Sequence, residues 1–297
     1  MTSLLDQSVR SFGKTGTALV FSLVGGWVIF MIVCPQLIAL DYSFRPLLPL
    51  RDIGGPQDVY TLKNYITLAA NTLHRTIFIK TIWSSLLVTL LALVLCYPIA
   101  FYLARTARPS MVSLLMMGII VPYWINELLR IFAWQLILSD AGILNQLLLW
   151  LQVTNEPVNF RAGNSAVILG MVYAYILFMV FPLYNAMESL DANQIDGARG
   201  LGAGWLRIHW KIVIPHAKPG MAVGCIMTFM LAAGSVAAPQ LLGSPSSFWF
   251  TQIIYTNYET ANWNLGTAYA EVLALLCLVF MFVMLRIFRV GLRQFVR

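Results

Sequence analysis

Charged residues are scarce in this chain: Asp, Glu, Lys and Arg make up 10% of its 297 residues, whereas hydrophobic residues make up 59%. Soluble domains carry about a quarter charged residues, so this composition excludes an ordinary soluble domain and predicts an integral membrane protein. In a soluble protein the net charge of +7 would indicate nucleic-acid binding. In a chain this apolar the position of each charge matters more than the total, and no nucleic-acid partner is expected.

Cysteine and histidine are also sparse. All four cysteines lie in apolar runs, which is typical of small buried side chains rather than of a disulfide framework: Cys34, Cys96, Cys225 and Cys277. The three histidines have no neighbour at metal-ligand spacing: His74, His209 and His216. The sequence therefore predicts no metal site, and it places His209 and His216 in a water-exposed loop.

Motifs of nucleotide-binding and catalytic domains are missing from the sequence. Gly13-Lys14-Thr15 resembles the end of a Walker A loop, but Ser8 occupies the position of the first glycine and no strand precedes it. A nucleophile elbow, a dinucleotide fingerprint and a carboxylate pair are absent as well. We therefore predict a protein that is not an enzyme and that holds no cofactor of its own.

Long apolar runs are plentiful. Six are long enough to cross a bilayer core of about 30 Å: Thr17–Leu40, Ile77–Leu103, Met111–Ile137, Ser165–Met187, Met221–Leu242 and Thr267–Phe288. The sequence thus predicts an all-α, polytopic protein with six transmembrane helices in contact with lipid. The first run is too long for a cleaved signal sequence. The third is interrupted by Pro122, Asn126, Glu127 and Arg130, which predicts a shorter span followed by a bent or interfacial helix.

Lys and Arg are distributed unevenly among the connecting segments. The segment from Gly243 to Gly266 holds neither, whereas four arginines lie close to the C-terminus: Arg286, Arg289, Arg293 and Arg297. Loops rich in Lys and Arg tend to stay in the cytoplasm. We therefore expect both termini and the polar segment at residues 188–220 to be cytoplasmic.

That polar segment, Ser189–Gly220, lies between two apolar runs and must contact water or a soluble partner, because lipid cannot satisfy irregular backbone. Asp191 followed by Gln194 predicts a capping box at the start of a helix. Three apolar residues form a stripe along this helix: Ile195, Ala198 and Leu201. Gly202 interrupts it, and a second helical pattern leads to Pro215 and Pro219-Gly220.

The same residues resemble the EAA loop of the membrane subunits of bacterial ABC importers. Asp196-Gly197-Ala198 stand where that family has Glu-Ala-Ala, Gly202 stands at its glycine, and Ile214-Pro215 stand at its later Ile/Leu-Pro pair. The resemblance implies a cytoplasmic coupling loop over 188–220. It assigns contact with an ATPase to Asp196, Gly197, Ala198, Arg199, Gly202, Ala203 and Trp205. The alternative is an ordinary amphipathic cytoplasmic loop.

Other segments resemble the spermidine/putrescine branch of these permeases: Leu62–Tyr65, Val121–Arg130 with Ala133-Trp134, and Gly142–Asn145. The resemblance implies one permease domain over 1–297, like that of a type I ABC importer, in the bacterial inner membrane. Its implied partners are a second six-helix permease forming a heterodimer, two ATPase subunits that hold ATP and Mg, and a periplasmic substrate-binding protein. Permeases for iron, thiamine, sulfate, opines or aminophosphonates stay open as alternatives, as does a secondary transporter.

A path for a polyamine should offer carboxylates and aromatic faces to its ammonium groups. Glu127 and Glu271 are the acids within or at the edge of spans in the expected outer half. The aromatic candidates lie in the third and fourth spans: Tyr123, Trp124, Trp134, Tyr173 and Tyr175. The alternative is that Glu127 and Arg130 form an i,i+3 ion pair and that the aromatics belong to an interfacial belt.

Overall fold

The computed structural model describes residues 2–49, 51–244 and 247–291, with side-chain positions from residue 13. Every regular element in these ranges is helical, so the all-α prediction is confirmed. Contacts divide the chain into two compact units, one formed by residues 1–68 and 257–271 and the other by residues 69–256 and 272–297. The single permease domain expected over 1–297 stays a prediction. Arg293 and Arg297, on which part of the expected tail charge rests, lie outside the described residues.

The first unit contains two consecutive helices and the loop that follows them. α1 (Thr2–Val28) bends at Gly13, whose φ of 70° lies in the left-handed region. It leads through the π-helical segment η1 (Ile29–Val33) into α2 (Cys34–Ser43). Parts of three further helices belong to this unit: α3 (Lys63–Ala70), α13 (Phe250–Glu259) and α14 (Trp263–Phe288).

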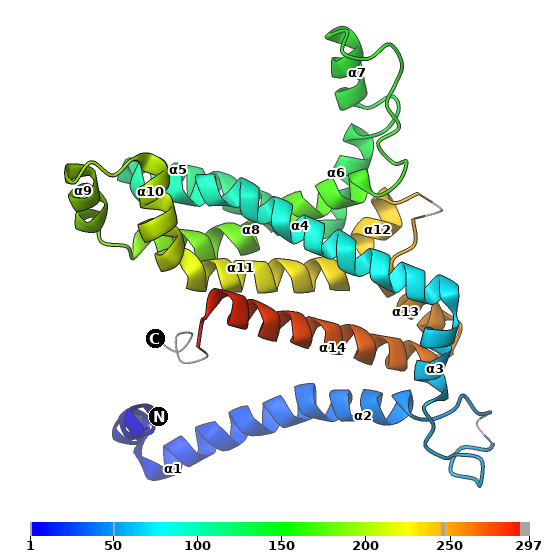
Figure 1. Ribbon diagram of the computed structural model, residues 1–297. Coiled ribbons are helices and arrows are strands. Elements are labelled where there is room, and N and C mark those ends of the chain that lie inside the picture. Colours follow the sequence, from blue (N-terminus) through cyan, green and yellow to red (C-terminus); the bar gives the residue numbers. More distant parts are fainter. Residues whose placement is uncertain (1, 50, 245–246, 292–297) are drawn as a thin grey trace. The chain divides into compact units, whose positions relative to one another are not determined.

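Three long helices pack against one another at the centre of the second unit: α4 (Thr72–Arg105), α8 (Ser165–Glu188) and α11 (Ile214–Gly234). In Figure 1 they are coloured cyan, green and yellow. Gly220 of α11 approaches α8 so closely that a Cβ atom there would lie 2.3 Å from the carbonyl oxygen of Pro182. Small residues permit such close approach between membrane helices. Gly220 therefore serves helix packing and does not close a loop.

Shorter helices connect the three long ones. Between α4 and α8 lie α5 (Pro109–Ile120), η2 (Val121–Trp124), α6 (Glu127–Ile137) and α7 (Ile143–Trp150). Between α8 and α11 lie α9 (Ala192–Gly200), α10 (Trp205–Ile208) and η3 (His209–Val213), and α12 (Ala237–Leu242) follows α11. Figure 1 shows α9 and α10 at one end of the long helices and α12 at the other.

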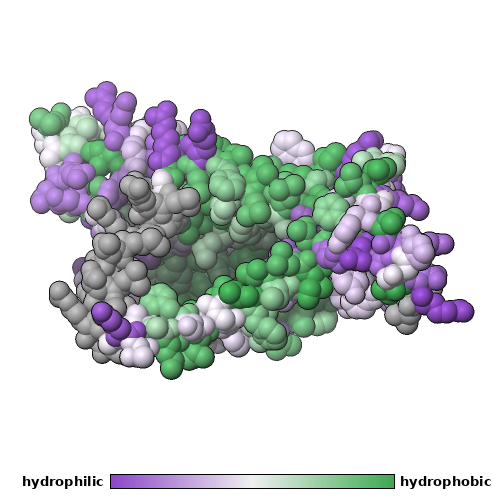
Figure 2. Space-filling model, turned by 90° about the horizontal axis from the view of Figure 1, so that it is seen from below, coloured by the Kyte–Doolittle hydropathy of each residue, from purple (hydrophilic) through white to green (hydrophobic). Residues whose placement is uncertain are grey.

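Five helices in the described residues are long and apolar enough to cross a membrane, and a bent pair gives a sixth if it counts as one span. The first, second, fourth and sixth predicted spans are confirmed to within several residues. The third bends by 97° between Trp124 and Glu127, as its interruptions predicted. Asn126 caps the outgoing helix by accepting the Leu128 N–H at 2.8 Å. Apolar residues occupy the middle of the face in Figure 2, with hydrophilic residues toward its ends.

The fifth predicted span was wrong in its limits. We expected a span over Met221–Leu242, preceded by a separate helical pattern that leads to Pro215 and Pro219-Gly220, but the candidate span runs from Trp205 to Gly234, and α12 is a separate helix. Pro215 has no N–H and its ring crowds the carbonyl four residues earlier. The helix accommodates it by widening, so that the Ile214 N–H bonds to the His209 carbonyl five residues back. Pro35 follows the π-helical segment η1 in the same way.

Candidate functional site

The polar segment after α8 forms a short capped helix, α9. Asp191 accepts the Asn193 N–H at 3.0 Å, which confirms the predicted helix start. At the other end the Ala203 N–H bonds to the Ala198 carbonyl and the Gly202 N–H to the Arg199 carbonyl. This pair of bonds is a Schellman motif. It requires a left-handed residue, and Gly202 has a φ of 77°, so the expected role of this glycine in the turn is confirmed.

The two sides of α9 differ in exposure. Ile195 is buried, and Ala198 and Ala203 pack against the same apolar core as α4 and α8. Leu201 was expected in this stripe, but it is 91% exposed because the chain leaves the helix at this residue. Other exposed residues of the segment are the ion pair Asp196–Arg199 (3.2 Å) and Gly197, Gly202, Trp205, Leu206 and Trp210. Gln194, Arg207 and Lys211 are exposed too, so the exposed apolar side chains of this segment lie among polar and charged ones.

His209 is not water-exposed, so that expectation was wrong. Its side chain is 5% exposed. Its ring lies 4.2 Å from that of Trp205 and 4.4 Å from that of Phe101, and its Nδ1 lies 2.8 Å from the hydroxyl oxygen of Tyr97. It is buried because the helix continues through this position and turns it toward α4. His216 is exposed, as expected, and hydrogen-bonds to Ser189.

At the other end of the second unit the exposed residue Glu127 lines an open pocket of about 290 Å³. Its walls come from the start of α6, from α8, and from the point where α11 ends before α12: Glu127, Tyr175, Met230, Leu231, Gly234, Ser235, Val236 and Ala237. Ser235 is in an extended conformation, which ends α11, and its carbonyl accepts the Thr251 hydroxyl at 2.6 Å. One carboxylate, one phenol and the end of a helix therefore meet in one pocket.

Sequence reasoning identified Glu127 and Tyr175 but missed the helix end at Gly234-Ser235. An available signal was the pair Gly234-Ser235 itself, followed by Pro239, inside a run that we predicted as one continuous span. The apolar character of the flanking residues concealed it.

Arg130 does not pair with Glu127. Among the ion pairs formed by the described residues none joins the two, and the Arg130 guanidinium carbon lies 4.4 Å from the centre of the Tyr123 ring. The Tyr123 hydroxyl donates to the Ala174 carbonyl and accepts the Leu177 N–H at 3.1 Å. Tyr123 and Arg130 thus pack against α8, and the i,i+3 ion pair is wrong as an account of Glu127.

The remaining predicted path residues do not line this pocket. Trp124 is 85% exposed. Trp134 and Tyr173 contact each other edge to face with ring centres 5.4 Å apart, and Trp134 packs against an apolar cluster. Glu271 belongs to the first unit, where it accepts a hydrogen bond from the Gln36 amide at 2.7 Å. Of the predicted path residues, the structure therefore places Glu127 and Tyr175 in the pocket that the described residues form here.

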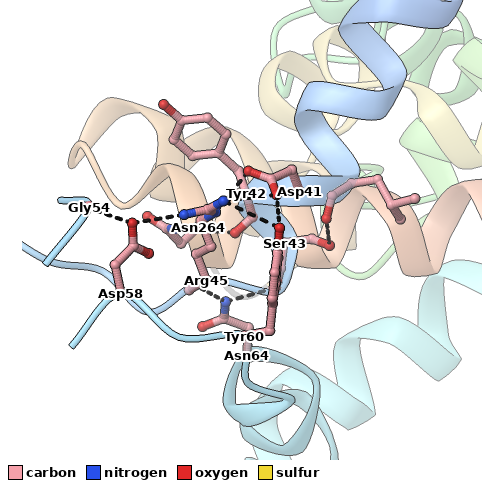
Figure 3. A network of polar contacts seen from close by, with 10 residues as sticks. Asp41, Tyr42, Ser43, Arg45, Gly54, Asp58, Tyr60, Asn64 and Asn264 are labelled. Atoms are coloured by element: carbon pink, nitrogen blue, oxygen red, sulfur yellow. Dashed lines mark hydrogen bonds and ion pairs between the residues drawn. The ribbon is translucent and has the colours of Figure 1, made fainter. Parts of the chain in front are cut away.

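In the first unit a polar network holds the loop after α2 (Figure 3). Arg45 bonds to Asp41 at 2.8 Å and to Asp58 at 2.7 Å, and Tyr60 donates its hydroxyl to Asp41 at 2.8 Å. The Gly54 N–H bonds to Asp58, whose side chain is 5% exposed. The hydrogen bond to Asp41 raises the pKa of Arg45 above its usual value. No sequence motif predicted this network, because its members are separated by irregular backbone.

The chain matches known proteins over most of its length. Residues 96–290 match the family model described as binding-protein-dependent transport system inner membrane component. The spermidine/putrescine transport system permease protein PotB of Escherichia coli (strain K12) is 35% identical over 247 residues, 82% of this chain and 87% of that protein. The protein of the same name from Haemophilus influenzae is 30% identical over 282 residues, 93% of this chain and 94% of that protein.

Two solved structures have a similar fold. The crystal structure of a bacterial ABC transporter involved in the import of the acidic polysaccharide alginate matches with a TM-score of 0.72, at 17% identity, over 96% of this chain and 98% of that one. The alginate transporter in complex with an alginate pentasaccharide-bound periplasmic protein matches with a TM-score of 0.73 over 96% and 99%. At this identity the likeness concerns the fold alone, and it confirms the predicted fold class.

Proposed function

The chain belongs to the binding-protein-dependent transport system inner membrane components, and from this premise we propose that it is a permease subunit of an ATP-driven importer of polyamines. It is a multi-pass protein of the inner membrane. The proposed substrate class is that named for its relatives, spermidine and putrescine. In this proposal the chain forms half of the translocation path, and alternating access is driven by separate ATPase subunits.

The observation that carries the substrate class is the position of Glu127 in the pocket at the end of α11. The last carbonyl groups of a helix lack partners within the helix, and this end carries a partial negative charge. Gly234 brings that end into the same pocket as the Glu127 carboxylate and Tyr175. Both features favour a cation over an anion. An alkylammonium group fits these walls, which combine a few oxygen acceptors with apolar residues.

The exposed side of α9 and the turn that follows it, which we call the coupling surface, support the proposed partners. In this proposal the exposed side of α9 and its turn contacts an ATPase subunit, which holds ATP and Mg. The assembly contains two such subunits, a second permease and a periplasmic substrate-binding protein. Four large apolar side chains of this short segment are exposed, Leu201, Trp205, Leu206 and Trp210. Exposed apolar residues that gather in one region are typical of a protein–protein interaction site.

Uptake by the assembled complex tests this proposal. The chain is produced with its ATPase, second permease and binding protein and reconstituted into vesicles, and uptake of radiolabelled spermidine and putrescine is measured with and without internal ATP. We expect ATP-dependent uptake that excess unlabelled polyamine abolishes and excess thiamine or sulfate does not. Uptake of thiamine or sulfate in place of polyamine would contradict the substrate class, and uptake driven by an ion gradient without ATP would contradict the importer.

A further inference from the structure

One buried imidazole joins the segment after α9 to the long helix α4. His209 lies at the start of η3, directly after α10. On one side its ring contacts Trp205, and on the other it contacts Phe101 and bonds to the hydroxyl of Tyr97, both of which belong to α4. A single side chain thus connects the end of the proposed coupling surface to a membrane-spanning helix.

Each of the two helices contains a proline near this contact. Pro98 follows Tyr97 inside α4, and Pro215 follows the π-helical segment that begins at His209. A proline removes one backbone hydrogen bond and is a usual place for a helix to bend. The contact between Tyr97 and His209 therefore joins two helices close to the points where each can bend.

The imidazole is not an optimal residue for packing alone. Its Nε2 is buried and has no hydrogen-bond partner, which destabilises the folded state relative to an apolar ring of similar size. Apolar replacement of both partners of a buried hydrogen bond is often neutral or stabilising. A buried polar pair with one unpartnered nitrogen, placed close to the proline of each helix, indicates a role in movement.

We propose that His209 and Tyr97 form a latch that makes the cytoplasmic end of α4 move together with α9 and α10 when the ATPase closes. His209 is a positioning residue in this proposal, because it acts through the two helices and touches no solute. The inference rests on the proposed ATP-driven import and names residues that transmit the motion into the membrane.

Three variants of the full complex separate the latch from simple packing. Tyr97→Phe removes one hydroxyl and keeps the ring, and the double variant Tyr97→Phe/His209→Phe makes the contact wholly apolar. Tyr102→Phe is the matched control, since Tyr102 lies on the same helix with its side chain 46% exposed. Amide hydrogen exchange in nanodiscs, with and without ATP, reports the movement at the cytoplasmic end of α4. Thermal unfolding reports stability.

We expect ATP to change exchange at the end of α4 in the wild-type complex and in Tyr102→Phe, and this change to be lost in the double variant while its thermal midpoint stays equal or rises. Solute uptake per ATP should fall roughly threefold to tenfold, the range given by loss of one hydrogen bond. An ATP response in the double variant equal to that of the wild type would overturn the latch, as would losses that only follow a lower thermal midpoint.

Should the double variant fail to fold, Tyr97→Phe carries the same test, with a similar loss expected because the same hydrogen bond is removed, and an unchanged ATP response again overturns the latch. Hydrogen exchange needs no solute. Wild-type complex that imports neither spermidine nor putrescine would therefore contradict the proposed substrate and leave the exchange result to decide on the latch.

Discussion

The carboxylate of Glu127 lies in a setting unlike that of the other acids described above. Asp41 and Asp58 bind Arg45, and Asp196 binds Arg199. Glu127 lies beside Tyr175 and the end of α11, and Arg130 turns away from it toward Tyr123. Its charge is therefore available to a cationic solute.

Replacing Glu127 by Gln keeps the size of the side chain and removes this charge. A hydrogen bond to a charged group contributes about 1.5–3 kcal/mol, and water in an open pocket reduces that gain. We expect polyamine uptake to fall about tenfold at normal protein levels, measured as radiolabelled uptake per amount of inserted protein. Glu156→Gln, at an exposed position, is the matched control. Normal uptake in Glu127→Gln would remove this residue from the path.

Asp58 is the most buried member of the network around Arg45, with its side chain 5% exposed. Asp58→Asn removes the charge that faces Arg45, and loss of a hydrogen bond between charged groups costs about 1.5–3 kcal/mol. We expect the loop to open about tenfold more often and trypsin to cleave faster after Arg51. Gln57→Asn, at an exposed residue of the same loop that does not adjoin the cleaved bond, should leave the cleavage rate unchanged. Equal rates in both variants would show that the network does not hold the loop.

The helix α9 and its turn form the element that sequence analysis described best. Its start and its end follow local rules, since Asp191 caps the first turn and Gly202 supplies the left-handed residue of the Schellman motif. A Cβ atom at Gly202 would meet nothing within 4 Å. The constraint at this position is therefore the backbone conformation and not space.

Gly202→Val places a β-branched residue in the left-handed region, at a cost of about 1–2 kcal/mol. We expect the last turn of α9 to unwind, so that uptake and ATPase co-purification fall roughly fivefold or more while membrane insertion persists. Gly202→Asn is the matched control, because asparagine tolerates this conformation, and it should retain most of the activity. Full uptake and normal ATPase association in Gly202→Val would contradict a coupling role for this turn.

The placement of Lys and Arg predicts the orientation of the whole chain, and this prediction can be tested with single added cysteines. Asn193→Cys lies on α9 and Gln57→Cys in the loop after α2, both at exposed positions. We expect a membrane-impermeant maleimide to label Gln57→Cys in intact spheroplasts and Asn193→Cys only after permeabilisation. The wild-type protein controls for its four native cysteines. The reverse pattern would place both termini outside the cytoplasm.

One copy of this chain is not expected to form a complete translocation path. The described residues of one copy offer at most six candidate spans and one proposed coupling segment, whereas alternating access requires two walls around a path. We expect no ATP-dependent uptake when the second permease is left out of the reconstituted complex. Uptake by this chain with ATPase and binding protein alone would indicate a homodimer instead of the proposed heterodimer.

The transmembrane helices, helix caps and turns could be predicted from the sequence, because they depend on neighbouring residues and on the surrounding lipid or water. The cost of exposed backbone in lipid makes long apolar runs helical, so four spans and the bend near Asn126 could be predicted. The cap at Asp191 and the turn at Gly202 depend on neighbours within a few positions. These features need no knowledge of distant contacts, which is why sequence reasoning found them.

Features that depend on distant residues could not be predicted in this way. Whether Pro215 ends a helix or is absorbed in a π-helical segment depends on packing against α4 and α8, and that packing turns His209 inward. Glu127 and the end of α11 line the same pocket only because α6, α8 and α11 meet there. Periodicity describes the face of one helix. It does not say which other helix covers that face, and this pairing created the pocket and the buried imidazole.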